Sequence, residues 1–208
     1  MIQRIANQFQ IGSFTKLRPL CLLAALLLGA CSSLKVPATI PRFSPERLLR
    51  TQSEGVILEA YPLEGHEAYW EVFDEDLPRA GIAAVWVKFG RARADALDLK
   101  GLQIKLRAGS RELSPLAAHE VLGQYYRGRG IRAYGVLAHE KSRQDLGAVI
   151  FKPRTLAPNG SIEGFLFFKI DPERSKNWTR GTSLVVEKIR LPKGKKFQIV
   201  LPLSDANS

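Results

Sequence analysis

The chain has 208 residues but only two cysteines, one methionine and three histidines, and no internal repeat is evident. It also lacks any uninterrupted apolar run of the roughly 20 residues that a bilayer-spanning helix needs. These absences exclude polytopic membrane proteins, and the absence of compositional bias excludes collagen-like and low-complexity classes. With 45% hydrophobic residues, the composition is that of one globular domain. A domain of this length needs neither a disulfide nor a structural metal to fold.

Acidic residues are missing from the first 30 positions, which carry three basic residues and then the short apolar run 19–30. A basic segment followed by a short apolar run and small residues is typical of a secretory signal peptide. The run has about a dozen residues, well short of the length of a spanning helix. We therefore predict that residues 1–30 are a signal peptide that is cleaved from the mature chain.

The apolar run ends in Leu28-Gly29-Ala30-Cys31, which resembles the lipobox of bacterial lipoproteins. The resemblance implies recognition of Leu28, Gly29 and Ala30 by a signal peptidase, cleavage before Cys31, and acylation of the Cys31 thiol and of the new N-terminus. The alternative is an ordinary secreted protein in which Cys31 is incidental. Ser32 follows Cys31, which resembles the arrangement that Gram-negative lipoproteins of the outer membrane carry; in other bacteria the implied anchor lies in the cell membrane.

Two or more acyl chains hold a protein stably at a membrane, so we expect a lipid-anchored domain that faces the periplasm. Cys21 leaves with the signal peptide and Cys31 carries the lipid. The mature domain then has neither a free thiol nor a disulfide, which excludes thiol catalysis and cysteine-ligated metals. The net charge of +11 falls only by the three basic residues of the signal peptide, so the mature chain stays basic.

The segment that follows the cleavage site favours extended conformations. Three prolines interrupt residues 31–54, namely Pro37, Pro41 and Pro45. Prolines stiffen and extend a linker, so residues 31–54 are predicted to be a tether. Ser44 before Pro45 is typical of a helix start, which predicts a short helix over 45–52. Residues 204–208 are expected to form a flexible tail.

Residues 55–203 are dominated by short apolar or alternating segments that are separated by Gly, Pro and Asn. The predicted strands are 56–60, 81–89, 102–107, 112–113, 164–170, 184–191 and 197–201. About seven short antiparallel strands are typical of a β-sandwich. We predict a mainly β fold with an immunoglobulin-like topology, although the cysteine pair of antibody domains is absent and strand order stays open.

Helical spacing interrupts this pattern at residues 114–144. Ser114-Pro115 is a typical helix start, and the apolar residues that follow fall on one helical face: Ala118, Val121, Leu122 and Tyr125. We predict a helix over 115–126 that packs on the sheet through these four residues, and a second helix over 131–144. Insertions on a rigid scaffold often carry function, although covering a sheet edge is the more common role.

The histidines do not form a metal motif. A zincin helix needs a second His four residues after the first, but Gly123 and Arg143 occupy those positions after His119 and His139. Convergence of these two with His66, and with Glu120 or Glu140, is an alternative. Scattered surface or half-buried histidines are the simpler interpretation, so no metal is predicted.

Catalytic motifs are also absent. The chain has no nucleophile elbow, no P-loop and no dinucleotide fingerprint. The acidic run Asp74-Glu75-Asp76 offers carboxylates for Ca²⁺ but lacks the spacing of an EF-hand, so a solvated turn between strands is the simpler interpretation. We therefore expect a non-catalytic protein without a cofactor.

Basic residues are the remaining signal, and they form two clusters. The first comprises Arg127, Arg129 and Arg132, and the second Lys193, Lys195 and Lys196 in a predicted hairpin turn. Such clusters attract anionic headgroups, lipopolysaccharide phosphates or acidic glycans. They also serve solubility, and lysines in a turn discourage edge-to-edge strand pairing. Nucleic acid is not expected outside the cell.

Two functions follow. The first is a non-catalytic accessory lipoprotein that binds an envelope protein or a second copy of itself. Five aromatic residues are its candidate contacts if they face solvent, and packing in the core or on the sheet is the alternative: Tyr69, Trp70, Tyr125, Tyr126 and Trp178. Trp86 is expected in the core. The second is a binder of anionic envelope polymer or lipid headgroups through the two basic clusters. Polymer binding weakens steeply with salt, whereas an apolar protein interface does not.

Overall fold

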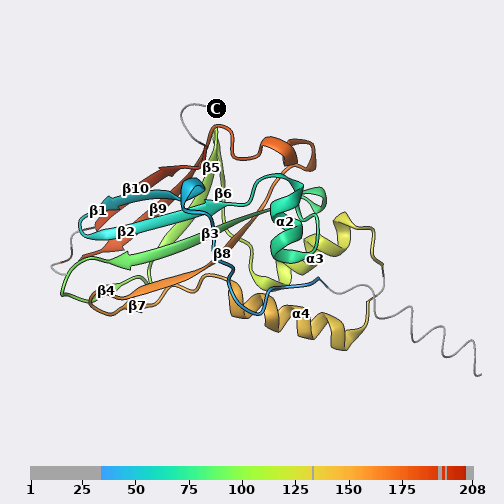
Figure 1. Cartoon of the computed structure of the whole chain (residues 1–208), viewed down its shortest axis with the longest axis horizontal. Coiled ribbons are helices and arrows are strands. Elements are labelled where there is room, and N and C mark those ends of the chain that lie inside the picture. The colour runs from blue at the N-terminus through green and yellow to red at the C-terminus, as the bar shows by residue number, and fades with distance from the viewer. Residues whose placement is uncertain (1–33, 133, 192–193, 195, 205–208) are drawn as a thin grey trace, which may run out of the picture.

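The computed structural model describes residues 34–132, 134–191, 194 and 196–204, and these residues form two antiparallel β-sheets and three α-helices arranged in layers (Figure 1). Sheet A has the order β1-β2-β3-β8. Its strands are β1 (Leu49–Ser53), β2 (Val56–Pro62), β3 (Ile82–Arg91) and β8 (Ser161–Lys169). One face of sheet A packs on sheet B and the other on the helices.

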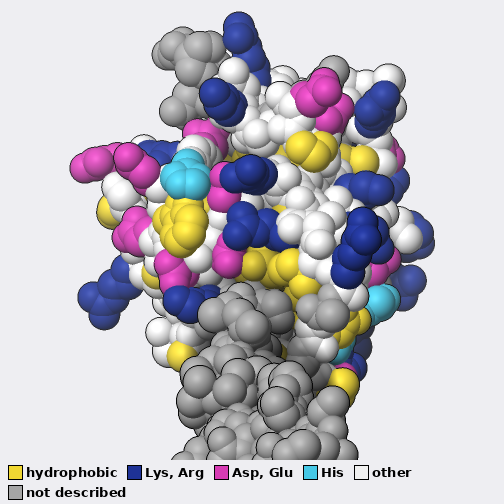
Figure 2. All heavy atoms as spheres, turned by 90° about the vertical axis from the view of Figure 1, so that its right-hand side faces the viewer, with side chains coloured by type: hydrophobic (Ala, Val, Ile, Leu, Met, Phe, Trp, Pro, Cys, Tyr) yellow, Lys and Arg dark blue, Asp and Glu magenta, His cyan; other side chains and the backbone are white. Residues whose placement is uncertain are grey.

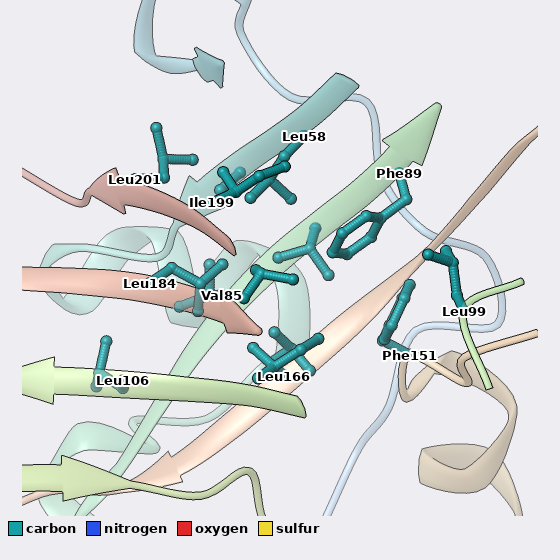
Figure 3. Close-up of a cluster of buried hydrophobic side chains, with 14 of the residues drawn as sticks. Leu58, Val85, Phe89, Leu99, Leu106, Phe151, Leu166, Leu184, Ile199 and Leu201 are labelled. Atoms are coloured by element: carbon teal, nitrogen blue, oxygen red, sulfur yellow. The ribbon is translucent and has the colours of Figure 1, made fainter. Parts of the chain in front are cut away.

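Sheet B has six strands in the order β6-β5-β9-β4-β7, with β10 paired to the other edge of β9. They are β4 (Leu97–Asp98), β5 (Gln103–Ala108), β6 (Arg111–Leu113), β7 (Thr155–Leu156), β9 (Thr182–Arg190) and β10 (Lys196–Pro202). The core between the sheets includes Val85 and Phe89 from β3 and Leu184 from β9, opposed across the layer (Figure 3). The predicted mainly β, sandwich-like fold is confirmed, and the immunoglobulin-like strand order stays a prediction.

The strands β3 and β8 of sheet A have buried residues on both faces, whereas the edge strand β1 has no fully buried residue. In β3, Val85 and Val87 point toward sheet B while Ala84 and Trp86 point toward the helices. Successive residues of a strand point to opposite faces, so a strand covered on both faces needs apolar residues throughout. This requirement explains the nearly continuous apolar run that predicted β3, and it places Trp86 in the core as expected.

Three helices cover the outer face of sheet A: α2 (Gly65–Phe73), α3 (Ala118–Gly128) and α4 (Val136–Val149). Short 3₁₀ segments are η1 (Pro45–Arg47), η2 (Pro78–Ala80) and η3 (Pro172–Asn177). Within the described residues, no helix has the length and apolar character needed to cross a membrane.

The helix predictions were partly right. The helix predicted over 115–126 is α3, shifted toward the C-terminus, and three of its four predicted contact residues are fully buried. The helix predicted over 131–144 is α4, which begins after Gly135 in the extended N-cap position and continues to Val149. The segment around His66, where no helix was predicted, is α2, which begins without a side-chain cap.

The tether prediction is wrong for the described part of residues 31–54. Leu34 is buried, and Phe43 packs on Tyr61 with ring centroids 4.5 Å apart. The predicted helix over 45–52 is only η1, and β1 then pairs with β2 over its whole length, from Leu49↔Ala60 to Ser53↔Val56. The prolines therefore mark an irregular path across the domain rather than a linker.

Gly164 in β8 is a point of close backbone approach. The chain that leaves α4 crosses the outer edge of sheet A here, and Phe151 N donates a hydrogen bond of 2.9 Å to Phe165 O. A Cβ atom at position 164 would lie 2.5 Å from both Cα and N of Phe151. Real Cβ atoms do not approach backbone this closely, so only glycine fits this position without displacing the segment after α4.

We expect Gly164→Ala to lower the free energy of unfolding by about 2 kcal/mol or more, because the new methyl group forces this segment away from sheet A. Gly147→Ala is the matched control, since nothing lies within 4 Å of a Cβ at this position of α4. It should raise stability by about 0.5–1 kcal/mol through helix propensity. Urea unfolding of both variants measures the difference, and equal stability of the two would contradict the predicted contact.

Candidate binding site

The three histidines lie apart. His66 lies in the first turn of α2 with Nδ1 3.1 Å from Asp76 Oδ2, and His139 of α4 stacks on the ring of Tyr134. His119 is exposed on α3. In the part of the chain that the structure describes, no three His, Cys, Asp or Glu side chains come together as a metal site, so the alternative of convergent histidines is not supported.

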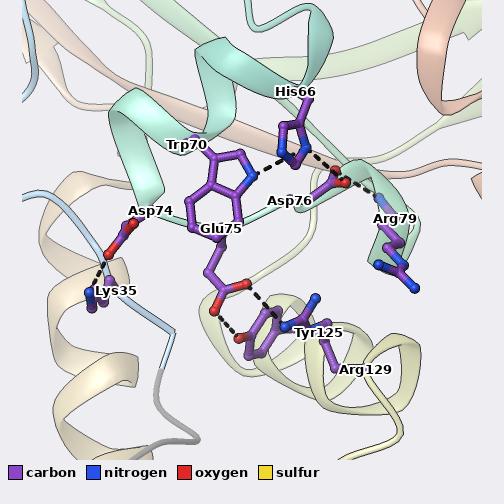
Figure 4. A network of polar contacts seen from close by, with 9 residues as sticks. All are labelled: Lys35, His66, Trp70, Asp74, Glu75, Asp76, Arg79, Tyr125 and Arg129. Atoms are coloured by element: carbon purple, nitrogen blue, oxygen red, sulfur yellow. Dashed lines mark hydrogen bonds and ion pairs between the residues drawn. The ribbon is translucent and has the colours of Figure 1, made fainter.

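The acidic run Asp74-Glu75-Asp76 follows α2, and its three carboxylates point to different partners (Figure 4). Asp74 forms an ion pair with Lys35, and Asp76 accepts a hydrogen bond of 3.3 Å from Arg79 N. The run is neither a Ca²⁺ loop nor a turn between strands. It joins the N-terminal segment, α2 and η2 to one another.

Glu75 is half-buried and contacts α3. Tyr125 Oη of α3 donates a hydrogen bond of 2.8 Å to Glu75 Oε1, and an Arg129 guanidinium nitrogen lies 3.8 Å from Glu75 Oε2 (Figure 4). Burial, and then the hydrogen bond to the Glu75 carboxylate, raise the pKa of the Tyr125 hydroxyl. Tyr125 is therefore a structural contact between α3 and the loop after α2, and not an exposed binding residue.

Most of the aromatic residues proposed as contacts are buried. Tyr69, Tyr125, Tyr126 and Trp178 all lie in the core, and Trp178 Nε1 donates a hydrogen bond of 3.1 Å to Leu63 O. Trp70, on the outer side of α2, is 42% exposed. Four of the five candidate contacts therefore pack in the core. Tyr69 and the two tyrosines of α3 lie in the core under the helices, whereas Trp178 follows η3 and lies in the core between the sheets.

The structure does not bring the two predicted basic clusters together. Three exposed arginines lie at and after the end of α3: Arg127, Arg129 and Arg132. The helix α3 contacts η2, η2 contacts η3, and η3 leads into the start of β9. Lys196 begins β10 and pairs with Arg190 at the far end of β9. Figure 1 shows α3 and the paired ends of β9 and β10 at Arg190 and Lys196 on opposite sides of the molecule. Lys193 and Lys195, like Leu28, Gly29, Ala30 and Cys31, lie outside the described residues.

A groove that the sequence did not reveal lies between η3 and the β5–β6 hairpin, with a volume of about 570 Å³. We call it the η3 groove. Leu106, Leu113, Ile170 and Trp178 contribute apolar atoms to its lining. Its hairpin wall turns at Gly109, whose φ of +61° lies in the left-handed region that glycine favours.

Cationic side chains outnumber acidic ones around the η3 groove. The basic lining residues are Arg111, Lys169, Lys176 and Arg180. All four are exposed, and none of them forms an ion pair with another described residue. The acidic lining residues are Asp171, which caps η3 by accepting a hydrogen bond of 3.1 Å from Glu173 N, and Glu173. Unpaired guanidinium and ammonium groups beside apolar atoms suit a ligand that carries carboxylate or phosphate groups on an apolar frame.

A second groove of about 380 Å³ adjoins the first and shares Lys176 and Arg180 with it. Its acidic residue, Glu64, is already bound by Thr179 Oγ1 and by Arg47, whose guanidinium lies 3.3 Å away. Since Glu64 is neutralised within the domain, Lys176 and Arg180 stay available to a ligand in either groove.

The groove cations escaped sequence analysis because each comes from a different segment. Arg111 begins β6, Lys169 ends β8, Lys176 lies in η3 and Arg180 precedes β9. No two of them are closer than four residues in sequence, so no charge cluster is visible. The described lining of the η3 groove includes neither histidine nor cysteine, and its chemistry is that of charge and apolar contact.

Comparison with known proteins assigns no family. No family model and no curated protein matches the chain. The yjhA protein of Bacillus subtilis superposes with a TM-score of 0.37 at 11% identity, covering 65% of this chain and 77% of that chain. A protein of unknown function from Listeria monocytogenes EGD-e superposes with a TM-score of 0.39 at 10% identity, covering 74% of this chain and 79% of that chain. The predicted lipoprotein ycdA of Bacillus subtilis gives 0.36 at 13% identity, covering 76% of this chain and 39% of that chain.

We expect Tyr125→Phe to destabilise the domain by about 1–3 kcal/mol at neutral pH, because the half-buried Glu75 carboxylate loses a hydrogen-bond donor. The pKa of Tyr125 is raised in the folded state, so the unfolded tyrosine loses its proton first. Wild-type stability should therefore fall as the pH rises above about 10, and this fall should be smaller in Tyr125→Phe.

Urea unfolding at neutral and alkaline pH checks both effects. Tyr134→Phe is the control, since Tyr134 is half exposed and its hydroxyl forms no hydrogen bond with the other described residues. Equal stability of the two variants at neutral pH would show that the Tyr125–Glu75 contact contributes nothing.

Proposed function

We propose that this protein is a non-catalytic, lipid-anchored module of the bacterial envelope that binds a protein partner through the η3 groove. The observation that carries the proposal is the groove itself, where four cations that form no ion pair with the described residues line a cavity together with apolar side chains. An acidic segment of a partner protein matches both features, because its carboxylates meet the cations and its apolar side chains meet Leu113 and Ile170.

The anchor part of the proposal rests on the lipobox-like Leu28-Gly29-Ala30-Cys31 and on the basic and apolar segments before it. Acylation of Cys31 would hold the domain at a membrane, and Ser32 favours the outer membrane in a Gram-negative cell. This location matches a groove that selects a partner rather than one that carries out a reaction.

The second candidate is a binder of an anionic envelope polymer or lipid headgroup at the same groove. It is favoured by the excess of basic over acidic residues in the lining. The two candidates differ in their dependence on salt, since a polymer held by phosphates or carboxylates alone dissociates as ionic strength rises. Apolar contacts with a protein persist.

We expect Cys31→Ser to abolish acylation, because the thiol is the acceptor of the diacyl group that the lipobox resemblance implies. Mass spectrometry of the membrane-extracted protein should find the wild type without residues 1–30 and with added acyl mass, and the variant without acyl mass. Cys21→Ser is the matched control and should be acylated normally. A free Cys31 thiol in the wild-type protein would refute the anchor.

We expect the double substitution Arg111→Gln and Arg180→Gln to weaken partner binding at least about tenfold, since each lost charge-assisted hydrogen bond contributes about 1.5–3 kcal/mol. The control substitutes Arg154 and Arg190, two exposed arginines outside the groove lining. The measurement is photocrosslinking in native envelopes from a reactive amino acid at Glu173.

A protein adduct that still forms when crosslinking is done at high salt, and that is absent in the groove variant but not in the control, supports the proposal. An adduct with polymer or lipid that forms only at low salt favours the second candidate. Equal adducts in the groove variant and in the control would rule out binding at the η3 groove.

A further inference from the structure

The junction of α3 and α4 exposes large apolar side chains that no described part of the domain covers. Tyr134, Val136 and Leu137 are 45%, 74% and 87% exposed. Val136 and Leu137 form the first turn of α4, and Tyr134 directly precedes its N-cap, Gly135. Single exposed apolar residues are common, but several together mark a contact surface.

The domain holds this apolar group in place. The Tyr134 ring stacks on two buried or half-buried rings, with centroid distances of 4.3 Å to Tyr126 and 4.8 Å to His139, and these two rings are themselves 5.8 Å apart. These two rings belong to α3 and α4, so Tyr134 ties the helices together while part of its ring stays exposed. The first turn of α4 is therefore presented from a fixed support.

Basic side chains accompany the apolar group. Arg127 and Arg132 form no ion pair with any described residue, and the ion pair of Arg129 with Glu75 is long, with 3.8 Å between nitrogen and oxygen. The acidic residues further along α4 are already paired, Glu140 with Arg143 and Asp145 with Lys141. Figure 2 shows basic side chains interspersed with apolar ones on this side of the molecule. The surface therefore suits an apolar layer with a negatively charged boundary.

The N-terminal segment starts its path across the domain beside α4. Leu34 is buried, and its carbonyl oxygen accepts a hydrogen bond of 3.1 Å from Ser142 Oγ in the middle of α4. Cys31 precedes Leu34 by three residues, which span at most about 11 Å when fully extended. A lipid on Cys31 would therefore keep α4 next to the membrane.

We propose that the α3–α4 face, formed by Tyr134, Val136 and Leu137 with Arg127 and Arg132, rests on the anionic phospholipid surface of the membrane that anchors the chain. The apolar side chains enter the boundary between headgroups and acyl chains, and the guanidinium groups meet lipid phosphates. This inference rests on the proposed lipid anchor. In this orientation the paired ends of β9 and β10 at Arg190 and Lys196, on the opposite side of the molecule (Figure 1), point away from the membrane.

The test uses the mature, acylated protein reconstituted in phosphatidylcholine vesicles, with and without about a third of phosphatidylglycerol. An environment-sensitive dye is attached at Leu137→Cys. The matched control carries the dye at Val200→Cys, since Val200 is an apolar residue of β10 that is 46% exposed. Brominated lipids quench a dye that enters the acyl region.

We expect quenching at position 137 to exceed quenching at position 200 at least threefold, and to increase with phosphatidylglycerol. Replacing Arg127 and Arg132 by Gln should remove that increase, whereas replacing Arg154 and Arg190 should not. Equal quenching at both positions of a vesicle-bound protein would overturn the docking proposal and leave the anchor intact. If the protein purified from membranes carries no acyl groups and does not bind the vesicles, both the anchor and the docking proposal are overturned. If a protein bound at position 137 shields the dye from lipid, the docking proposal is also overturned.

Discussion

The burial of both faces of β3 and β8 in sheet A is the constraint from which the rest of the structure follows. β3 and β8 pair along nine positions, from Ile82↔Lys169 to Gly90↔Ser161, and their side chains feed two separate cores. Because these strands have apolar side chains on both faces, both faces have to be shielded from solvent. Sheet B and the helical layer are therefore both required. The helices are therefore part of the fold rather than an optional insertion, and their aromatic residues serve the second core before any partner.

Sequence patterns predicted the elements whose burial is periodic. The run at 81–89 and the alternation at 102–107 correspond to β3 and β5, because one or two buried faces leave a direct trace in sequence. The helix α2 escaped notice because Glu64 provides no side-chain cap at its start. The segment 34–48 escaped because its apolar residues pack without a regular period.

The candidate site was less accessible to prediction than the fold. Charge clusters in sequence pointed to Arg127–Arg132 and Lys193–Lys196, yet the η3 groove collects Arg111, Lys169 and Arg180 from three separate segments. Only the pairing of β5 with β6 and the return of the chain from β8 through η3 to β9 bring them around one cavity. Such a site depends on long-range topology, which single-sequence reasoning does not supply.

The packing of residues 34–53 on the domain changes how far an anchored protein could act. A free tether of the predicted length would let the groove sweep a large volume, and its effective concentration toward any one target would be low. With Leu34 held at α4 and β1 paired to β2, the volume that the groove of a lipid-anchored protein could reach would be a thin shell beside the proposed anchor. A partner within that shell would meet the groove at high effective concentration, whereas a partner beyond it would have to come to the membrane.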